Sequence, residues 1–472
     1  MTGFSDEPSE TAKRALADVT YKPFWLDHER SEEGLTSLVG HADADLVVIG
    51  GGFSGLWTAL LAKEAEPARD VVLLEASTVG AAASGRNGGF CSSSLTHGLA
   101  NGLSRWPGEM GQLVSLGEEN LNGIEDAVAR YGIDCAFSRV DSLDVATESY
   151  QVAEQVAFVK RAEAFGSFEL LGAEQAQARV HSPTYRGAIC ESKGLALVDP
   201  GRLADGLLRA CVALGVRVHE HTPATRLGRT HGGVAVETPY GRLSARRCAL
   251  GTSAFQPLLR RYRSYVVPVY DYVLMTEPLD RSQLEATRWS GREGVSDSGN
   301  QFHYYRMTDD NRILWGGYDA VYYPGKGIGP QFESRPESFA RIAGHFLSTF
   351  PQLEGLRFSH AWGGAIDTCS RFCPFWGMGL GGRACLAAGY TGLGVGASRF
   401  GAQVMLDLLD GRDTQRTRLE MVRSLPIPFP PEPLKTATIA LTRWSLARAD
   451  SRGGSRNMWL RTLDRIGAGF DS

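Results

Sequence analysis

A glycine-rich turn near residue 50 constrains the fold of this chain more than any other feature. Residues 45–49 form a short apolar run that predicts a buried parallel strand, and the segment GGGFSG follows at residues 50–55. In a GxGxxG turn the glycines permit a tight bend, close approach of backbone to a pyrophosphate, and packing of helix on strand. A second apolar run, residues 71–74, ends at Glu75, whose carboxylate can hydrogen-bond a ribose diol. Residues 45–75 therefore predict the opening β-α-β unit of a dinucleotide-binding fold.

A second loop of small residues follows this unit. Residues 80–90 have the sequence GAAASGRNGGF. Such a loop could be a flexible surface segment, or it could lie along a pyrophosphate and reach an isoalloxazine ring. With this loop the sequence resembles the FAD-dependent oxidoreductases of the D-amino-acid oxidase and glycine oxidase superfamily. Within them it is most similar to the γ-glutamylputrescine oxidase branch, in which a GxxASGRNGG stretch occupies this position. The resemblance implies that the cofactor is FAD.

The resemblance covers roughly residues 40–410 and includes two later loops. Residues 247–252 (RCALGT) resemble the family's strand and turn near the cofactor, and residues 389–394 (GYTGLG) resemble a loop that opens a helix over the flavin. A helix N-terminus there would stabilise negative charge on reduced flavin. Either loop could also be a plain turn. The residues expected to bind FAD are Gly50, Gly52, Phe53, Ser54, Gly55, Glu75, Ala76, Ser84, Gly85, Arg86, Asn87, Gly88, Gly89, Ala224, Gly251, Tyr390, Thr391, Gly392, Leu393 and Gly394.

The length of 472 residues exceeds the size at which one hydrophobic core stops growing, so two domains are expected. The expected fold class is α+β, with an FAD-binding Rossmann-like domain of the glutathione reductase type and an interleaved substrate domain built on an antiparallel sheet. The expected limits are an N-terminal leader at 1–43, an FAD-binding domain at 44–105, 195–260 and 358–410, a substrate domain at 106–194 and 261–357, and a proline-rich linker with a helical tail at 411–472.

Periodicity of the apolar residues predicts further elements. Helical spacing extends over residues 109–131, 150–180 and 199–214. Residues 265–275 and 302–317 are rich in aromatic and β-branched side chains, which favours two long strands of an antiparallel sheet.

In the superfamily that this chain resembles, a hydride leaves a carbon that bears an amine and goes to flavin N5, which gives an imine. The expected substrate is therefore a primary or secondary amine or an amino acid. The resemblance also places Arg371 in a turn beside the flavin, where its guanidinium could bind a carboxylate through two parallel hydrogen bonds. A surface salt bridge is the alternative for Arg371.

The aromatic segment 302–306 supplies the other candidates for substrate contact. Alternation along a strand sends His303 and Tyr305 to one face and their neighbours to the other. We expect Tyr305 to face the flavin and close the pocket, with His303 beside it. Tyr270 and Tyr272 are weaker candidates, and all these aromatic side chains could instead be ordinary sheet packing.

Oxygen is the expected electron acceptor, with release of peroxide. Relatives of the sarcosine oxidase type carry a lysine on the oxygen-reactive side of the flavin, but the matching segment 312–317 (RILWGG) has none. A dehydrogenase that passes electrons to a quinone or a carrier protein is therefore an alternative, and a flavin-binding structural protein without turnover is another. We expect non-covalent FAD, because Gly363 and Gly364 occupy the region where those relatives have a cysteine. Cys91 is the alternative point of covalent attachment.

Bulk properties exclude several classes of protein. A formal net charge of −4 gives no argument for nucleic acid as a partner, and no run reaches the about 18–20 apolar residues of a membrane span. The acidic first ten residues do not resemble a signal peptide. The eight cysteines form no CxxC pair, so we expect a cytoplasmic protein without a metal site. The basic, tryptophan-containing tail could contact an anionic membrane, although a helical pair packed on the FAD-binding domain is preferred.

Overall fold

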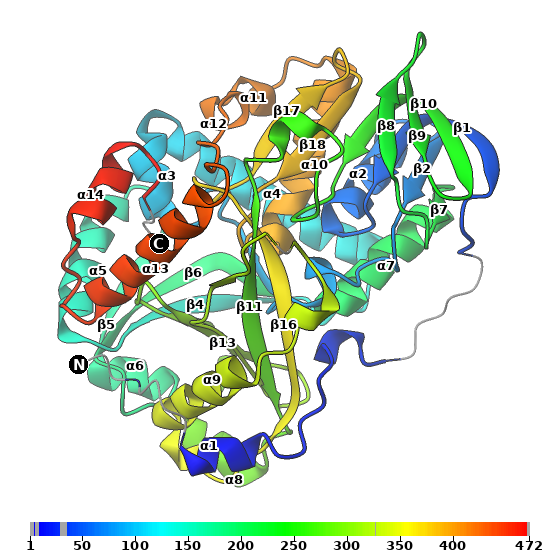
Figure 1. The fold of residues 1–472 in the computed structure, drawn as a ribbon. Helices are drawn as coiled ribbons and strands as arrows, with labels where there is room; N and C mark the ends of the chain where they lie inside the picture. The colour runs from blue at the N-terminus through cyan, green and yellow to red at the C-terminus, as the bar shows by residue number, and fades with distance from the viewer. Residues whose placement is uncertain (1–3, 5–8, 29–34, 326, 470–472) are drawn as a thin grey trace.

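Two β-sheets, one of eight strands and one of ten, form the framework of the protein (Figure 1). The computed structural model describes residue 4 and residues 9–28, 35–325 and 327–469. Its α-helices are α1 (Glu10–Ala15), α2 (Phe53–Ala65), α3 (Leu99–Arg105), α4 (Met110–Arg130), α5 (Ser149–Ala162), α6 (Ala173–Arg179), α7 (Pro200–Ala213), α8 (Arg281–Thr287), α9 (Pro336–Thr349), α10 (Gly394–Asp410), α11 (Gln415–Arg418), α12 (Glu420–Arg423), α13 (Leu434–Asp450) and α14 (Met458–Arg465).

The first sheet is parallel at its centre. Its main path is β17 (Phe375–Gly379), β18 (Ala384–Ala388), β10 (Gly241–Leu250), β1 (Gly40–Ile49), β2 (Val71–Leu74) and β7 (Arg217–His219), and β9 (Val234–Glu237) and β8 (Arg226–Arg229) extend from β10. The strands from β18 to β7 are parallel to their neighbours. Their carboxyl ends therefore meet at one edge of the sheet, which is where ligands bind in such folds.

The second sheet is antiparallel, apart from the pairing of β12 with β4 among the described strands. Its path is β15 (Val321–Tyr322), β11 (Val267–Thr276), β14 (Ile313–Gly317), β13 (His303–Met307), β12 (Gly294–Asp297), β4 (Ser138–Ala146), β6 (Gly187–Leu197) and β3 (Phe90–Ser92), with β16 (Phe358–Thr368) beside β11 and β5 (Phe168–Gly172) beside β6. Helix α9 packs on β11 and β14. Together the two sheets confirm the expected α+β class.

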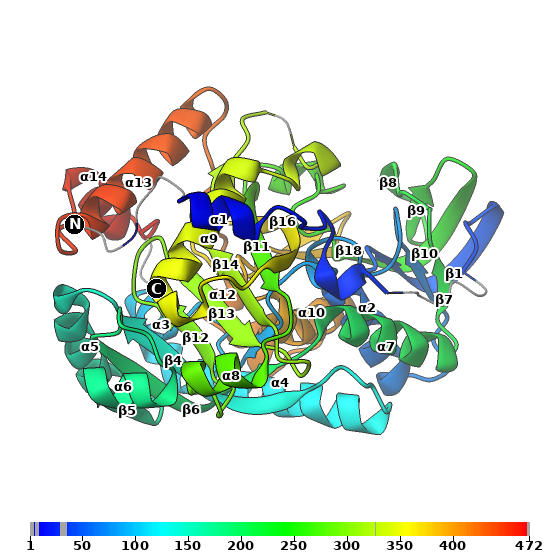
Figure 2. The ribbon, with the colours of Figure 1, turned by 90° about the horizontal axis from the view of Figure 1, so that it is seen from below.

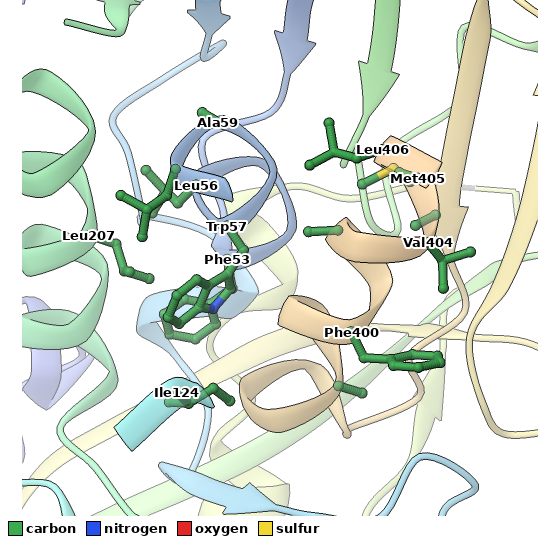
Figure 3. Close-up of a cluster of buried hydrophobic side chains, with 14 of the residues drawn as sticks. Phe53, Leu56, Trp57, Ala59, Ile124, Leu207, Phe400, Val404, Met405 and Leu406 are labelled. Atoms are coloured by element: carbon green, nitrogen blue, oxygen red, sulfur yellow. The ribbon is translucent and has the colours of Figure 1, made fainter. Parts of the chain in front are cut away.

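Helix α2 is the centre of the core beneath the first sheet. Its side chains meet α7 on one side and α10 on the other, and Figure 3 shows Phe53, Leu56 and Trp57 between these helices. These three residues are at most 3% exposed. Burial on all sides explains why the sequence of α2 has a weak amphipathic pattern, since a helix surrounded by protein needs no polar face.

The structure differs from the sequence expectations at two elements. Residues 302–317 are not one long strand but the hairpin β13–β14, because the sequence TDDNR at residues 308–312 forms a turn with Asn311 at φ +63°. Aspartate and asparagine favour such turns through local hydrogen bonds. The helical pattern expected over 150–180 is interrupted by β5, which pairs with β6.

Two strands lie in a different sheet from the one that the expected domain limits imply. Strands β3 and β16 pair within the second sheet, although the sequence placed their residues in the FAD-binding stretches. These two strands connect the cofactor loops directly to the antiparallel sheet.

The N-terminal leader and the C-terminal tail flank the two sheets in the sequence. In the leader, which lies partly outside the described residues, Trp25 is 3% exposed and its indole N–H donates to the carbonyl oxygen of Asn87 at 2.8 Å. The expected helical pair of the tail is α13 and α14. Figures 1 and 2 both place it at the opposite end of the molecule from β1 and β7. Within the described parts of the chain, none of the helices has the length and apolar character to cross a bilayer.

Candidate functional site

A cavity of about 1360 Å³ lies where the two sheets meet. Its walls include Ile49 and Leu74 at the carboxyl ends of β1 and β2, Gly251 just after β10, and Tyr390 just after β18. This is the edge at which a parallel sheet of this type binds its ligand. Pockets for small molecules usually have volumes of about 300–1,000 Å³, so this cavity can hold a dinucleotide and a second molecule.

The glycine turn after β1 forms one wall of the cavity. Gly50 has φ +105°, and a Cβ atom at this position would be 2.5 Å from the carbonyl oxygen of Gly251. Gly52 caps the N-terminus of α2, and the backbone N–H of Phe53 donates to Ser84 Oγ at 2.9 Å. Helix α2 therefore presents its positive end to the cavity, as an anion-binding helix does.

Glu75 lies at the end of β2 and lines the cavity. Its Oε2 atom accepts a hydrogen bond from the backbone N–H of Gly51 at 2.6 Å, and Oε1 accepts one from the N–H of Ser77 at 2.8 Å. Ala224 lines the same part of the cavity. The carboxylate thus fixes the glycine turn while it faces the space that a ribose would occupy.

The loop at residues 80–90 is held by its own side chains and is therefore not a flexible surface segment. Arg86 Nε donates to the carbonyl oxygen of Ala81 at 2.8 Å, and its guanidinium forms an ion pair with Glu333 at 2.7 Å. Asn87 Nδ2 donates to the carbonyl oxygen of Ser84 at 2.8 Å. A Cβ atom at Gly88 would be 2.7 Å from the ring of Tyr304, so the absence of a side chain brings this loop onto the second sheet.

The loop at residues 389–394 forms the facing wall and opens α10. Asp367 Oδ2 accepts a hydrogen bond from the N–H of Gly389 at 2.8 Å, and burial raises the pKa of Asp367 to about 6. Thr391 and Gly392 have φ values of +48° and +92°. The resulting bend directs the N-terminus of α10, at Gly394, toward the cavity.

The walls contain polar atoms that no described residue satisfies. The hydroxyls of Ser398 and Thr252 line the cavity and make no hydrogen bond among the described residues. Buried hydroxyls usually have partners. Together with the two helix N-termini and the glycine turn, these atoms fit a dinucleotide that carries a pyrophosphate.

Most of the residues expected to bind the cofactor line this cavity. The exceptions are Gly55, Gly85 and Gly89, where a Cβ atom would collide with Gly50, with Leu26, or with Val198 and Arg306. These three glycines permit close packing of the loops and do not face the cavity. Cys91, the alternative attachment point, is buried in the pairing of β3 with β6 and does not line it either.

The expected substrate contacts Tyr305 and His303 are on the wrong face of the second sheet. The Tyr305 hydroxyl hydrogen-bonds that of Tyr185 at 2.6 Å, and His303 Nδ1 contacts Asp297 Oδ2 at 2.6 Å. Both side chains are at most 1% exposed and are absent from the cavity wall. The alternation was predicted correctly, but α9 covers this face, so its aromatic side chains are core.

Arg371 also does not reach the cavity. Its guanidinium donates to the carbonyl oxygens of Ser424, at 3.0 Å, and Pro374, and lies over the ring of Trp106. Ser370 and Phe372 line the cavity, whereas the arginine between them points away. Of the two weaker candidates, Tyr270 lines the cavity and Tyr272 does not.

The sequence reasoning missed the pair that does face the cavity. The Tyr304 hydroxyl donates to Asp271 Oδ2 at 2.6 Å, and both residues line the wall between β11 and β13. The N–H of Tyr272 donates to Asp271 Oδ1 at 2.8 Å. Burial raises the pKa of Asp271 to about 6 and that of Tyr304 well above its usual range. The single acid in an otherwise apolar and aromatic strand at 267–275 was the available signal for Asp271.

No group of three histidine, cysteine, aspartate or glutamate side chains within the described residues is placed to hold a metal ion. The eight cysteines are all free and buried. Burial raises the pKa of Cys91 to about 12.

Comparison with known proteins agrees with this geometry. Residues 45–408 match the family of FAD-dependent oxidoreductases denoted DAO. The chain is 32% identical to the gamma-glutamylputrescine oxidoreductase of Escherichia coli K12 over 399 residues, which are 82% of this chain and 88% of that protein. It is 25% identical to the probable oxidoreductase OrdL of Haemophilus influenzae over 420 residues, which are 86% of this chain and 91% of that protein.

Solved structures share the fold. The glycine oxidase of Geobacillus kaustophilus superposes with a TM-score of 0.63 at 18% identity, covering 79% of this chain and 96% of that one. NikD, an amino acid oxidase of nikkomycin biosynthesis, superposes with a TM-score of 0.64 at 17% identity, covering 83% and 99%. Because the family match extends over well over half of the chain, the protein belongs to the family of FAD-dependent oxidoreductases.

Proposed function

We propose that this protein oxidises a primary or secondary amine, or an amino acid, to an imine. The observation that carries the proposal is the Asp271–Tyr304 pair, which faces the same cavity as the FAD loops. Bound FAD would accept a hydride from the carbon that bears the amine. The resemblance to a gamma-glutamylputrescine oxidoreductase supports an amine as the substrate class.

The FAD-binding residues of the proposal are those expected from the sequence that line the cavity. The N-terminus of α2, with Gly52 and Ser84, would hold the pyrophosphate, and Glu75 would bind the adenosine ribose. The N-terminus of α10 at Gly394 would place a positive dipole end beside the flavin ring. The FAD is proposed to be non-covalent, because the thiol of Cys91 lies away from the cavity.

Asp271 is the residue proposed to bind the substrate nitrogen. Glu333 is paired with Arg86, and Asp367 accepts from Gly389, whereas Asp271 faces the cavity with a tyrosine hydroxyl as its side-chain partner. A buried carboxylate attracts an ammonium group strongly. Its raised pKa also makes it a stronger base than an exposed aspartate, so it can accept the proton that the ammonium must lose before hydride transfer.

Anaerobic reduction of the bound flavin tests the proposal. The purified holoprotein is mixed with a panel of amines, polyamines and amino acids, and the flavin absorbance band is followed. Rapid bleaching by one chemical group is expected, and bleaching by none would refute amine oxidation. Any bleaching would also exclude a flavin-binding structural protein without turnover.

The electron acceptor is proposed to be oxygen, which yields peroxide. The alternative, transfer to a quinone or carrier protein, is favoured by one observation: no lysine is among the described residues that line the cavity. Turnover in air is compared with turnover under argon in the presence of an artificial acceptor. Peroxide formed at the rate of turnover would exclude the dehydrogenase. The free thiols support the proposal of a reducing, cytoplasmic compartment.

A further inference from the structure

The C-terminal tail, which lies beyond the family match, forms part of the cavity wall. Helix α13 has two different faces along its length. The residues on its inner face that line the cavity are Thr438, Ile439, Thr442, Arg443 and Leu446. The opposite stripe, at spacings of seven, three and four residues, is solvent-exposed and consists of Leu434, Leu441, Trp444 and Arg448. Trp459 and Leu463 of α14 line the cavity as well.

Hydrogen bonds to three separate parts of the body fix this tail in place. Asp450 accepts from the backbone N–H groups of Asn300 and Gln301 at 3.0 and 3.1 Å. At the other end of α13, the Tyr322 hydroxyl donates to Glu432 Oε1 at 2.5 Å. Arg105 donates to the carbonyl oxygens of two residues, 467 and 469, after α14. The wall is therefore a defined surface on the substrate side of the cavity.

Arg443 differs from the other arginine of the cavity wall. Arg86 is neutralised by its ion pair with Glu333. Arg443 forms no ion pair with a described residue, and its buried Nε atom has no hydrogen-bond partner. The side chain of Arg443 is half-buried, and this burial lowers the pKa of its guanidinium. A poorly solvated, unpaired cation is unfavourable unless an anion joins it.

The charges around Arg443 do not supply that anion. Asp319 lies close enough to act on the guanidinium electrostatically, but its carboxylate is already bonded to Arg341 at 2.6 Å and to the Ser338 hydroxyl at 2.6 Å. Arg335 and Arg341 add positive charge to the same region. Asp271 and Arg443 both line the cavity, and the charge of Asp319 acts on both groups.

We infer that the substrate carries an anionic group, such as a carboxylate, at the end remote from the oxidised carbon, and that Arg443 of the tail binds this group. The inference rests on the proposed amine oxidation, with the amine held at Asp271 and the anion at Arg443. Arginine suits this role because its planar guanidinium binds a carboxylate through two parallel hydrogen bonds. The tail would thus determine which amines the family's cofactor site oxidises.

The test compares two series of amines of matched chain length. Linear ω-amino carboxylates and unbranched alkylamines are mixed anaerobically with the holoprotein, and the ratio of their flavin-reduction efficiencies (rate constant divided by Kd) is measured. We expect the wild type to prefer the carboxylates. Arg443→Gln should lower the preference ratio about 10- to 100-fold, the usual weight of a charge-assisted pair, and Arg443→Lys should retain part of it.

Matched variants keep the test decisive. Arg448→Gln removes an arginine from the outer stripe of the same helix and should leave the ratio unchanged. Arg443→Glu should shift the preference toward diamines, which a lost fold could not do. An unaltered ratio in Arg443→Gln, or an equal fall in Arg448→Gln, would overturn the inference. FAD content is measured for every variant, so that lost cofactor is not mistaken for lost selectivity.

A binding measurement separates this inference from the proposed function. Pentanoate and pentanamide, which carry no amine, are titrated into the holoprotein and followed by the perturbation of flavin absorbance. The wild type should bind pentanoate at least about tenfold more tightly than pentanamide, and Arg443→Gln should lose this difference. If no amine reduces the flavin but this pattern holds, amine oxidation fails and the anion site stands. Equal binding of the two ligands by the wild type would refute the anion site itself.

Discussion

Substitution of Gly52 by alanine should weaken FAD binding while the protein still folds, so it tests the cofactor site independently of the fold. Gly52 has φ −80° and ψ −178°, a conformation that alanine adopts without strain. The added Cβ atom would be 2.9 Å from Ser84 Oγ, which is the free end of a short side chain and can rotate away. The protein should therefore fold, and the methyl group should occupy the space through which a pyrophosphate approaches α2.

The expected magnitudes follow from the groups that the substitution displaces. Rotation of Ser84 removes its hydrogen bond with the N–H of Phe53, which should cost about 1 kcal/mol of unfolding free energy. Displacement of the pyrophosphate removes about two hydrogen bonds to a charged group, each contributing about 1.5–3 kcal/mol. Since about 1.4 kcal/mol corresponds to a factor of ten, the affinity for FAD should fall about 100-fold or more.

Gly55→Ala is the matched control, because it lies in the same motif but faces the strand. Its Cβ atom would be 1.8 Å from the carbonyl oxygen of Gly50, a backbone atom that cannot move without separating α2 from β1. We expect a loss of about 3 kcal/mol or more in unfolding free energy, which the better helix propensity of alanine, about 1 kcal/mol, does not offset. This variant should lose both stability and FAD.

The assay titrates FAD into the apoprotein of each variant and measures urea unfolding of the same samples. Binding of FAD to Gly52→Ala within about threefold of the wild-type affinity would refute the placement of the pyrophosphate. An apoprotein of Gly52→Ala as unstable as that of Gly55→Ala would show that the motif is only a packing device.

Three further substitutions test the charges and the buried pairs. Because the pKa of Asp271 is raised to about 6, its ionised fraction falls roughly tenfold from pH 7 to pH 5, so the anaerobic flavin-reduction rate should fall likewise; the same step in a slow Asp271→Asn variant would contradict this role. Burial raises the pKa of Asp144 to about 7, so its contribution to stability is complete at low pH and is lost as the pH rises through 7. In urea unfolding, Asp144→Asn should remove about 1–2 kcal/mol of the wild-type loss between pH 5 and pH 8, a figure reduced because the residue is partly exposed. Tyr305→Phe leaves the Tyr185 hydroxyl without its partner and should lower the unfolding free energy by about 1–2 kcal/mol, while flavin reduction stays within about twofold.

The cofactor side of the site was predictable because its constraints are local. Gly50, Gly52 and Glu75 lie within one β-α-β unit, and each has a conformational or hydrogen-bonding requirement that only a few residue types meet. The family resemblance added the loops at 80–90 and 389–394, and both line the cavity. Local signals of this kind can be recognised in the sequence without knowing which elements pack together.

The substrate side was not predictable in the same way, because its constraints are tertiary. Alternation along β13 correctly separated Tyr304 from Tyr305, but each face of this strand carries a tyrosine, and both tyrosines are at least partly buried. Which face meets the flavin loops depends on α9, whose sequence carries no sign of the strand that it covers. Arg371 was misplaced for a similar reason, since its guanidinium donates to the carbonyl oxygen and the hydroxyl of Ser424, 53 residues further along the chain.

The C-terminal tail contributes to the cavity through tertiary contacts and not through the local motifs of the cofactor loops. The family match ends at residue 408, yet α13 and α14 complete a cavity whose other walls belong to the matched region. We expect a change in the glycine turn to lower the affinity for FAD. The hydrogen bonds that hold Glu432 and Asp450, at the two ends of the α13 segment, go to Tyr322, Asn300 and Gln301 and not to the cofactor loops. We therefore expect that changes in the tail can alter the substrate while the oxidative chemistry is retained. On this reasoning, exchange of the inner-face residues of α13 should alter which amines reduce the flavin and leave the affinity for FAD as it is.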